Sequence, residues 1–262
     1  MTTPERSELN EVGVRVLEHE PELGLRVPAE HIAQAREELV ASVGHLERGV
    51  WEPPANRGGG GLGFLMLEGL VARNLILAGR TCTELVGEGD VLQPSFAARD
   101  DNLVPYHVQW QVLEPCTVAV LDDSFARLLG RWPSVMSALL DRAVRRILRM
   151  SIHQALLQLS PLETRLLVLF WHLAERWGKV TPAGINIRLR LSHEVLGHVV
   201  GAQRASVTTA LRHIGESGRL ARRTDGTWLL RGSPPDQLDR VRWAHSDGSA
   251  RVALPGAGTQ YA

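Results

Sequence analysis

The stretch from Leu191 to Leu230 reads LSHEVLGHVVGAQRASVTTALRHIGESGRLARRTDGTWLL, and it decides the fold of the C-terminal part. Ser192 precedes an apolar run and can cap a first short helix by accepting a backbone N–H. Gly197 lies inside that helix and is expected to let a neighbouring helix approach closely. Gly201 can adopt the positive φ of a tight turn, so the first helix is expected to end there. The pattern therefore predicts two short helices within residues 193–216.

The second of these helices is expected to run from about Gln203 to about Glu216. Three apolar residues recur at i, i+4 and i+7 and predict a buried stripe: Val207, Leu211 and Ile214. The opposite face is small and cationic, and consists of Arg204, Ala205, Thr208, Thr209 and Arg212. Arginine can bind guanine through two hydrogen bonds, and threonine can offer a methyl group to thymine or a hydroxyl to phosphate. This face is therefore predicted to contact DNA.

A small hairpin is predicted directly after these helices, within Leu220–Leu230. Its centre is Asp225-Gly226, a pair that tolerates the positive φ angles of a two-residue turn. Arg222 and Arg223 stand at its base, where they can reach phosphate. Two helices followed by a basic hairpin indicate a winged helix-turn-helix, which inserts one helix into the DNA major groove. The alternative is a helical hairpin used only for packing, and the small cationic face argues against it.

The distribution of charge agrees with this prediction, although the 262-residue chain has a net charge of zero. Residues 1–133 hold 20 acidic and 11 basic residues, whereas residues 160–232 hold five acidic and 11 basic residues. The excess of positive charge therefore lies with the predicted helix-turn-helix, where phosphate must be neutralised. The length is typical of two domains.

Several classes of protein are disfavoured by the sequence. Cys82 and Cys116 are too few to form a cysteine-based zinc or iron–sulfur site, and reduced thiols are expected. No apolar run reaches the length of a membrane span, and the N-terminus lacks an apolar signal core. We therefore expect a cytoplasmic protein without a membrane partner.

The region before the helix-turn-helix predicts a sensor-like β domain. Residues 1–30 form a polar, acidic extension with weak structural signals, and residues 28–52 suggest a helix with a less regular end. Short strand-like segments separated by turn residues then predict a compact antiparallel β-roll or barrel within residues 31–132. The segments are Gly63–Leu67, Leu70–Leu77, Thr81–Leu85, Val108–Val112 and Thr117–Leu121.

A long helix is predicted from Pro133 to about Leu159, after a short one over Ser124–Leu129. Apolar residues at alternating steps of four and three suggest a seam for a partner helix. The seam consists of Met136, Leu140, Ala143, Ile147, Met150, Gln154 and Leu157, flanked by Arg142, Arg145, Arg146 and Arg149. An ordinary helix lying on its own domain is the alternative. A homodimer is favoured because helix-turn-helix proteins usually bind two half-sites as pairs.

The next helix, to about Trp177, is predicted to begin with a capping box. Ser160 would be the N-cap, Pro161 the first helical residue and Glu163 the reciprocal acceptor. A strand over Ile185–Leu191 then leads into the helix-turn-helix. The predicted domains are thus 1–30, an extension; 31–132, the β-roll; 133–159, the dimerisation helix; 160–232, the winged helix-turn-helix; and 233–262, a flexible tail.

This order of elements resembles the Crp/Fnr family of transcriptional regulators. The resemblance is most specific in LSPLETRLLVLFWHLAERWG (159–178) and in the stretch quoted first. It implies an α+β fold with a cyclic-nucleotide-binding-like (cupin-like) β-roll, a dimerisation helix and a winged helix. It also implies phosphate contacts by Ser192 and His193, and a recognition helix that begins with Gln203, Arg204 and Ser206, of which Arg204 would read guanine. Ala205 and Thr209 depart from the family pattern, so a different target sequence is expected.

The sensor half matches the family less well. LAGRTCTELVGEGDVLQP (77–94) resembles the approach to the family's ligand cassette, but no Gly-Glu follows Asp90. The position of the phosphate-binding arginine falls near Gln109-Trp110, and Arg99 stands beside two aspartates. Cyclic AMP is therefore disfavoured and no cofactor is predicted. Two alternatives remain open: an unidentified non-nucleotide effector, or a sensor domain that binds nothing in a constitutively active protein.

Other chemistry receives little support. His193 and His198 lack the i, i+4 spacing of a helical metal pair, and the glycines at 58–61 lack the Lys-Ser/Thr of a phosphate loop. His45, His107 and Trp110 could line a ligand or haem pocket, or be isolated core and surface residues. No catalytic constellation is found.

We expect a homodimeric regulator that binds double-stranded DNA, with RNA polymerase and a small effector as further partners. The alternative is a winged-helix module that binds another protein.

Overall fold

The computed structural model describes residues 9–54, 61–94 and 103–235, and the fold class is α+β, as predicted. The chain divides into two compact units. The first holds residues 1–158 and 192–204, and the second holds residues 159–191 and 205–262. Among the described helices, none is both long and apolar enough to cross a membrane.

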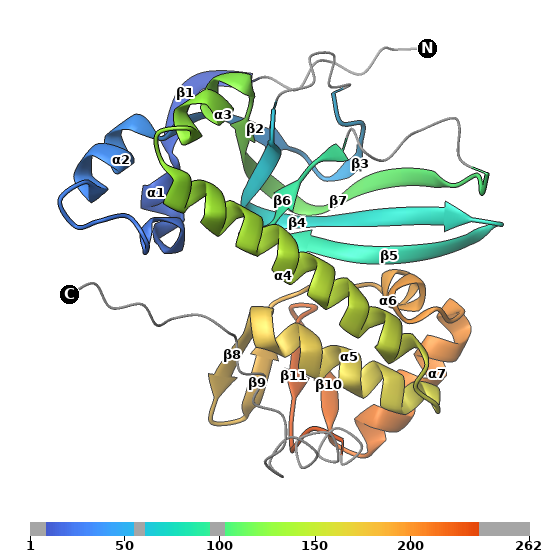
Figure 1. Cartoon of the computed structure of the whole chain (residues 1–262). Coiled ribbons are helices and arrows are strands. Elements are labelled where there is room, and N and C mark those ends of the chain that lie inside the picture. Colours follow the sequence, from blue (N-terminus) through green and yellow to red (C-terminus); the bar gives the residue numbers. More distant parts are fainter. Residues whose placement is uncertain (1–8, 55–60, 95–102, 236–262) are drawn as a thin grey trace, which may run out of the picture. The chain divides into compact units, whose positions relative to one another are not determined.

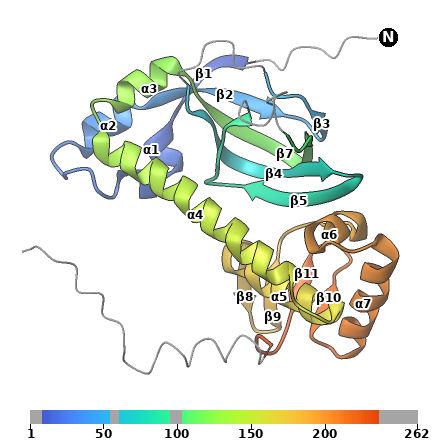
Figure 2. The ribbon, with the colours of Figure 1, turned by 45° about the vertical axis from the view of Figure 1, so that its right-hand side comes forward.

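The first unit is built on one antiparallel sheet, whose main path runs β1-β2-β7-β4-β5 (Figure 1). The short strands β3 and β6 pair with β7 and β4. The long strands β4 and β7 form the centre, and the β4–β5 hairpin extends from it (Figure 2). The strands are β1 (Leu9–Arg15), β2 (Val40–Leu46), β3 (Gly49–Trp51), β4 (Gly63–Leu77), β5 (Arg80–Gly87), β6 (Val91–Leu92) and β7 (His107–Leu121).

Two pairs of predicted strands are in fact single long strands. The segments on either side of Gly69 are continuous in β4, and the register against β7 shifts there, between Met66 and Val71. Gly69 has φ +95°, and a Cβ at this position would lie 2.3 Å from the carbonyl oxygen of Pro115. Only glycine fits this irregularity, so the turn-like signal in the sequence marks a β-bulge within a strand and not a strand end.

Residues 9–30 contain more regular secondary structure than their weak sequence signals suggest. They form β1, the short helix α1 (Val16–His19) and a 3-10 turn over Pro21–Gly24, and α2 (Ile32–Glu38) follows them. The prediction of a helix over 28–52 is wrong beyond Glu38, because β2 and β3 follow it. In β2 the alternate residues Ala41 and Val43 pack into the apolar core, as the two-residue period of a strand requires.

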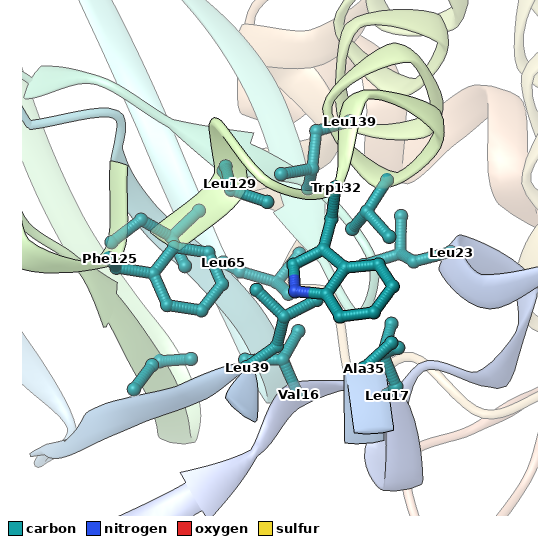
Figure 3. Close-up of a cluster of buried hydrophobic side chains, with 14 of the residues drawn as sticks. Val16, Leu17, Leu23, Ala35, Leu39, Leu65, Phe125, Leu129, Trp132 and Leu139 are labelled. Atoms are coloured by element: carbon teal, nitrogen blue, oxygen red, sulfur yellow. The ribbon is translucent and has the colours of Figure 1, made fainter. Parts of the chain in front are cut away.

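Trp132 lies at the centre of the main apolar cluster of this unit (Figure 3). Its indole N–H donates to Glu38 Oε2 at 3.0 Å, which satisfies the buried polar edge of the ring. The surrounding side chains come from helices and strands far apart in the sequence, and include Val16, Leu17, Leu23, Ala35, Leu39, Leu65, Phe125, Leu129 and Leu139.

Two helices follow β7, as predicted. The helix α3 (Asp123–Leu129) is capped by Asp122, whose Oδ1 accepts the N–H of Phe125 at 2.9 Å. The long helix α4 (Pro133–Leu157) begins with proline at its first position, where no intrahelical donor is lost. Val135 and Leu139 near its start are buried in the Trp132 cluster.

The second unit combines helices with a four-stranded antiparallel sheet of order β10-β11-β9-β8. Phe170 packs against Trp228, with ring centroids 4.9 Å apart. Its elements are α5 (Leu162–Trp177), β8 (Gly178–Thr181), β9 (Gly184–Ile187), β10 (Leu220–Arg222) and β11 (Trp228–Leu230), together with nearly all of α7 (Arg204–Glu216).

Two local predictions for this unit are corrected by the structure. The N-cap of α5 is Pro161, which offers no side-chain acceptor, so the capping box with Ser160 is wrong. The guanidinium of Arg165 instead donates to the carbonyl oxygen of Leu159 at 2.8 and 3.0 Å. The strand predicted to Leu191 ends at Ile187, because the pairing with β8 and with β11 stops at that residue.

Candidate nucleic-acid interface

The helix α6 (His193–Val200) begins as the sequence predicts. Ser192 has extended backbone angles, and its Oγ accepts the N–H of Val195 at 3.1 Å. This bond satisfies one of the free donors at the start of a helix. His193 follows as the first helical residue and is partly exposed. Ser192 and His193 thus stand at the positively polarised end of α6, where a phosphate group would be favoured.

The predicted glycine turn ends α6. Gly201 adopts the left-handed conformation, with φ 65° and ψ 38°. The N–H of Ala202 donates to the carbonyl oxygen of Gly197 at 2.9 Å, and this brings the turn close to the helix. A Cβ at Gly197 would lie only 2.7 Å from the Ala202 carbonyl oxygen. The group that approaches Gly197 is therefore the turn after α6, and not the neighbouring helix that the sequence suggested.

The helix α7 has the two faces that its sequence predicts. Val207, Leu211 and Ile214 are buried, and Ala210 extends their stripe. The predicted contact residues within residues 203–212 are all exposed: Gln203, Arg204, Ala205, Ser206, Thr208, Thr209 and Arg212. Ser192, His193, Gln203 and Arg204 belong to the first compact unit, and the later predicted residues belong to the second.

The C-terminal half of α7 carries a short chain of polar contacts. Arg212 Nη1 lies 2.7 Å from Glu216 Oε1, and its Nη2 lies 3.1 Å from His213 Nε2. His213 Nδ1 in turn lies 3.3 Å from Glu163 Oε1 on α5. A hydrogen bond from its own backbone N–H and the contact with His213 hold the pKa of Glu163 below its usual value. The Arg212 guanidinium therefore already has an acidic partner in the protein alone.

The predicted hairpin forms between β10 and β11. The N–H of Arg223 donates to the carbonyl oxygen of Thr227 at 2.8 Å, and Gly226 has φ +85°. Asp225 Oδ1 accepts the backbone N–H of Thr227 at 3.0 Å and its hydroxyl at 2.6 Å. These bonds lower the pKa of Asp225, and the charges of Arg223 and Arg190 add to the effect. The wing turn is thus closed by its own side chains.

The cations of the wing differ in their surroundings. Arg222 and Arg223 are both exposed, but the guanidinium of Arg222 lies over the ring of Trp228, 5.7 Å from its centroid, whereas Arg223 stands in the turn. Arg190 is a further exposed cation at this place, which the sequence prediction missed. A Cβ at Gly226 would lie 3.6 Å from Arg190 Cγ, so the stem of Arg190 runs along the turn. The alternation of basic and apolar residues before Leu191 is the signal that could have identified it.

The predicted dimer seam lies largely on one exposed side of α4. Met136, Leu140, Ile147 and Met150 are 36 to 64% exposed, and Gln154 is also exposed. Ala143 and Leu157 are partly buried, and Leu157 Cδ2 would lie 3.6 Å from a Cβ on Gly201. Two residues that the prediction omitted, Val144 and Leu148, are 55% and 59% exposed and widen the stripe.

The expected ligand-lining residues do not gather around a polar site. His45 and His107 are exposed at the surface. Trp110 is buried in a second apolar cluster, with its ring centroid 5.9 Å from that of Trp51 and the guanidinium of Arg73 at 5.8 Å. Of the two free cysteines, Cys82 is exposed and Cys116 is buried. Arg99 and its neighbouring aspartates, and the glycine run at 58–60, lie outside the described residues.

Comparison with known proteins identifies the fold. No family sequence model matches the chain, and no curated protein sequence matches it. Solved structures do match. A CooA mutant from Carboxydothermus hydrogenoformans has 18% identity over 90% of this chain and 98% of that one, with a TM-score of 0.61. A transcriptional regulator of the Crp/Fnr family from Thermus thermophilus has 17% identity over 79% of this chain and 100% of that one, with a TM-score of 0.54.

A third match is CLP of Xanthomonas campestris, described as a c-di-GMP responsive global regulator. It has 18% identity over 74% of this chain and 95% of that one, with a TM-score of 0.53. These structures share an antiparallel β domain followed by a C-terminal helical DNA-binding domain. The chain therefore has the fold of the Crp/Fnr family of transcriptional regulators, the family that its sequence motifs resemble.

Proposed function

We propose that the protein is a sequence-specific, DNA-binding transcriptional regulator that acts as a homodimer. The observation that carries the proposal is the exposed face of α7. It presents the exposed residues Arg204, Thr208 and Thr209 opposite a buried stripe. An α-helix fits the major groove of B-DNA, and these side chains match the donors, acceptors and methyl groups displayed there.

The base-reading role falls to Arg204. It is exposed at the first position of α7, directly after the glycine turn. Two parallel N–H donors allow an arginine to bind guanine O6 and N7 together. Gln203 and Ser206 flank it, and Thr208 and Thr209 add contacts to a base or a phosphate. Because Ala205 is small, the chain approaches the groove closely at this point.

The phosphate contacts are proposed at two places. Ser192 and His193 stand at the start of α6, where free N–H groups favour an anion. Arg223 and Arg190 flank the wing turn, and Arg222 lies beside them over Trp228. The excess of six positive charges in residues 160–232 supports this role, because DNA affinity depends on neutralised phosphates.

The dimer is proposed to form through the exposed apolar side of α4. Leu140, Val144, Ile147 and Leu148 are more than half exposed, and an apolar stripe of this length on a surface helix is typical of a helix–helix interface. A second copy of the chain supplies an identical stripe, and a two-fold axis makes the interface complementary to itself. Each copy would then bind one half of a near-palindromic site.

Control by a small molecule is a further part of the proposal, and cyclic AMP is disfavoured as that molecule. Near the place where the family resemblance implies a phosphate-binding arginine, this chain has Gln109 and Trp110, and Trp110 is buried against Trp51. A non-nucleotide effector is therefore the better candidate. A cytoplasmic location and an action on RNA polymerase would follow from the role in transcription.

Selection of bound duplexes from a random DNA pool by the purified protein tests the proposal. Enrichment of a two-fold symmetric motif is expected. A protein that enriches no motif, and whose retention of DNA is unaffected by salt, would contradict it. Salt-independent binding of a protein partner would then favour the alternative of a winged-helix interaction module.

A further inference from the structure

The helix α4 carries a row of arginines on the side opposite its exposed apolar stripe. Arg142, Arg146 and Arg149 follow one another at steps of four and three, so they lie on one face. We name these three residues the arginine ladder. Their side chains are only 9%, 16% and 33% exposed, whereas the neighbouring Arg145 is exposed. The ladder therefore faces the interior of the first unit.

The first rung joins α4 to the N-terminal segment. Arg142 Nη2 lies 2.6 Å from Glu20 Oε2, and both side chains are nearly buried. Arg142 Nη1 donates to the carbonyl oxygen of Gly89 at 3.0 Å. One guanidinium thus holds two segments that lie far apart in the sequence.

The second rung is a two-point ion pair with β5. Arg146 Nε lies 2.6 Å from Glu84 Oε1, and Nη2 lies 2.8 Å from Oε2. Arg146 Nη1 also donates to the carbonyl oxygen of Val91 at 2.9 Å. Burial opposes the ionisation of Glu84, but the bonds and charge of Arg146, helped by Arg73, hold the pKa of Glu84 below its usual value. Both partners of this rung are therefore charged.

The third rung binds the turn between β5 and β6. Arg149 is paired with Asp90, which is 4% exposed. The second carboxylate oxygen of Asp90 accepts the backbone N–H of Gly87 at 3.1 Å. The turn is thereby held from within by Asp90 and from α4 by Arg149.

The arginine ladder fixes the rotation of α4 about its own axis as well as the position of the helix. A rotation of α4 about its axis would separate buried charges from their partners, which is costly, whereas apolar contacts tolerate small rotations. The rungs lie on the opposite side of the helix from Leu140, Val144 and Ile147. The rotation that the ladder selects therefore decides which apolar side chains reach a partner helix.

We propose that the arginine ladder is a positioning device for the homodimer, and that it sets the rotation at which α4 presents its stripe to a second copy. The inference rests on the dimer in the proposed function, and extends it to the residues that set the interface. Arg142, Arg146 and Arg149 act through the stripe and touch no DNA in this account.

A disulfide between two copies measures the rotation directly. Ile147→Cys is made in a Cys82→Ser background, so that the new thiol is the exposed one. The full-length protein is oxidised without DNA, and the yield of covalent dimer is measured. Glu84→Gln and Arg146→Gln are then added singly and together, with Arg145→Gln as the matched control that removes one exposed cation from the same turn.

The parent protein is expected to form covalent dimer readily. Glu84→Gln and Arg146→Gln should each lower the yield by about fivefold or more, because each breaks the two-point pair of buried charges, and in Arg146→Gln only Arg73 remains beside Glu84, at 3.4 Å. The yield of covalent dimer in the double variant should be little lower than in the single variants, and Arg145→Gln should leave the yield unchanged. Arg149→Gln, at the most exposed rung, gives the same test if the Arg146 variant does not fold.

Two results would overturn the inference. One is a parent protein that forms no covalent dimer. The other is an unchanged yield in both Glu84→Gln and Arg146→Gln; a lowered melting temperature beside that unchanged yield would mean that the ladder only stabilises the fold. Because oxidation needs no DNA, a failure of DNA selection leaves this test intact, and a failure of this test leaves the DNA-binding proposal standing.

Discussion

Arg212 and Glu216 form an ion pair along one exposed edge of α7, with 2.7 Å between Nη1 and Oε1. Both side chains are about 60% exposed, and the acid stands on the helix that we propose enters the DNA groove. In the proposed complex Glu216 would therefore compete with phosphate for Arg212, and its own charge would repel the DNA backbone.

The first prediction concerns this pair. Glu216→Gln should raise DNA affinity by about threefold, because an exposed pair contributes well under 1 kcal/mol and its loss frees Arg212. Fluorescence anisotropy at several salt concentrations measures the effect. Glu175→Gln, an exposed acid on α5, is the control. A lower affinity in Glu216→Gln would mean that Glu216 holds Arg212 in the orientation that DNA needs.

The second prediction concerns the wing. Arg223→Ala and Arg190→Ala should weaken binding equally on all sequences, and each should reduce the slope of log K against log salt by about 1 unit. The reason is that phosphate contacts release bound counterions and carry no base information.

Arg176→Ala is the control for the wing variants, because its guanidinium stacks on Trp177 at 4.5 Å from the ring centroid. It removes one positive charge from the same unit, and the salt slope should stay unchanged. If the slope of log K against log salt were also unchanged in Arg190→Ala, Arg190 would not contact phosphate. The Arg223→Ala slope tests Arg223 independently.

The third prediction separates two roles of Ser192. Ser192→Ala should cost about 1 kcal/mol of unfolding free energy, because the cap to Val195 is lost. Ser192→Asp restores a capping acceptor but places a carboxylate beside the proposed phosphate. Urea unfolding should therefore show recovered stability, while the anisotropy titration should show weaker DNA binding. Full DNA affinity in Ser192→Asp would argue against a phosphate at this helix start.

The fourth prediction tests the dimer. Ile147→Glu or Leu140→Glu should shift the protein to monomer in sedimentation equilibrium without a large change in melting temperature, because both side chains are more than 60% exposed. Val50→Glu is the control, since Val50 is 67% exposed on β3. Dimers that persist in both α4 variants would place the interface elsewhere.

The elements that could be predicted from the sequence are those fixed by local chemistry. The Ser192 cap, the Gly201 turn and the Asp225-Gly226 hairpin depend on residues a few positions apart, and all three are present. The buried stripe of α7 likewise follows from its helical period. The fold class and the resemblance to the Crp/Fnr family rest on such signals.

The parts that were missed depend on distant contacts. Val16 and Leu17 become buried only through the Trp132 cluster, which no local pattern reveals. Gly69 looks like a strand end, and only the approach of Pro115 shows it to be a bulge. The heptad pattern predicted the apolar side of α4. The ion pairs on the opposite side could not be predicted in this way, because their partners lie some 60 residues away in the sequence or more.

The candidate interface was predicted as a set of residues but not as an arrangement. The exposure of Arg204 and of the threonines follows from helical period, whereas the pairing of Arg212 with Glu216 depends on side-chain conformation. Arg190 was missed because its role depends on the wing turn, more than 30 residues later in the chain.

The most direct test of the central claim is a pair of DNA selections, with wild-type protein and with Arg204→Ala, from one random pool. The wild type should yield a motif with two half-sites about one helical turn apart. Arg204→Ala should bind that motif more weakly by about 1–3 kcal/mol and lose preference at one base position in each half. An asymmetric motif, or the same motif and affinity from both proteins, would contradict the account.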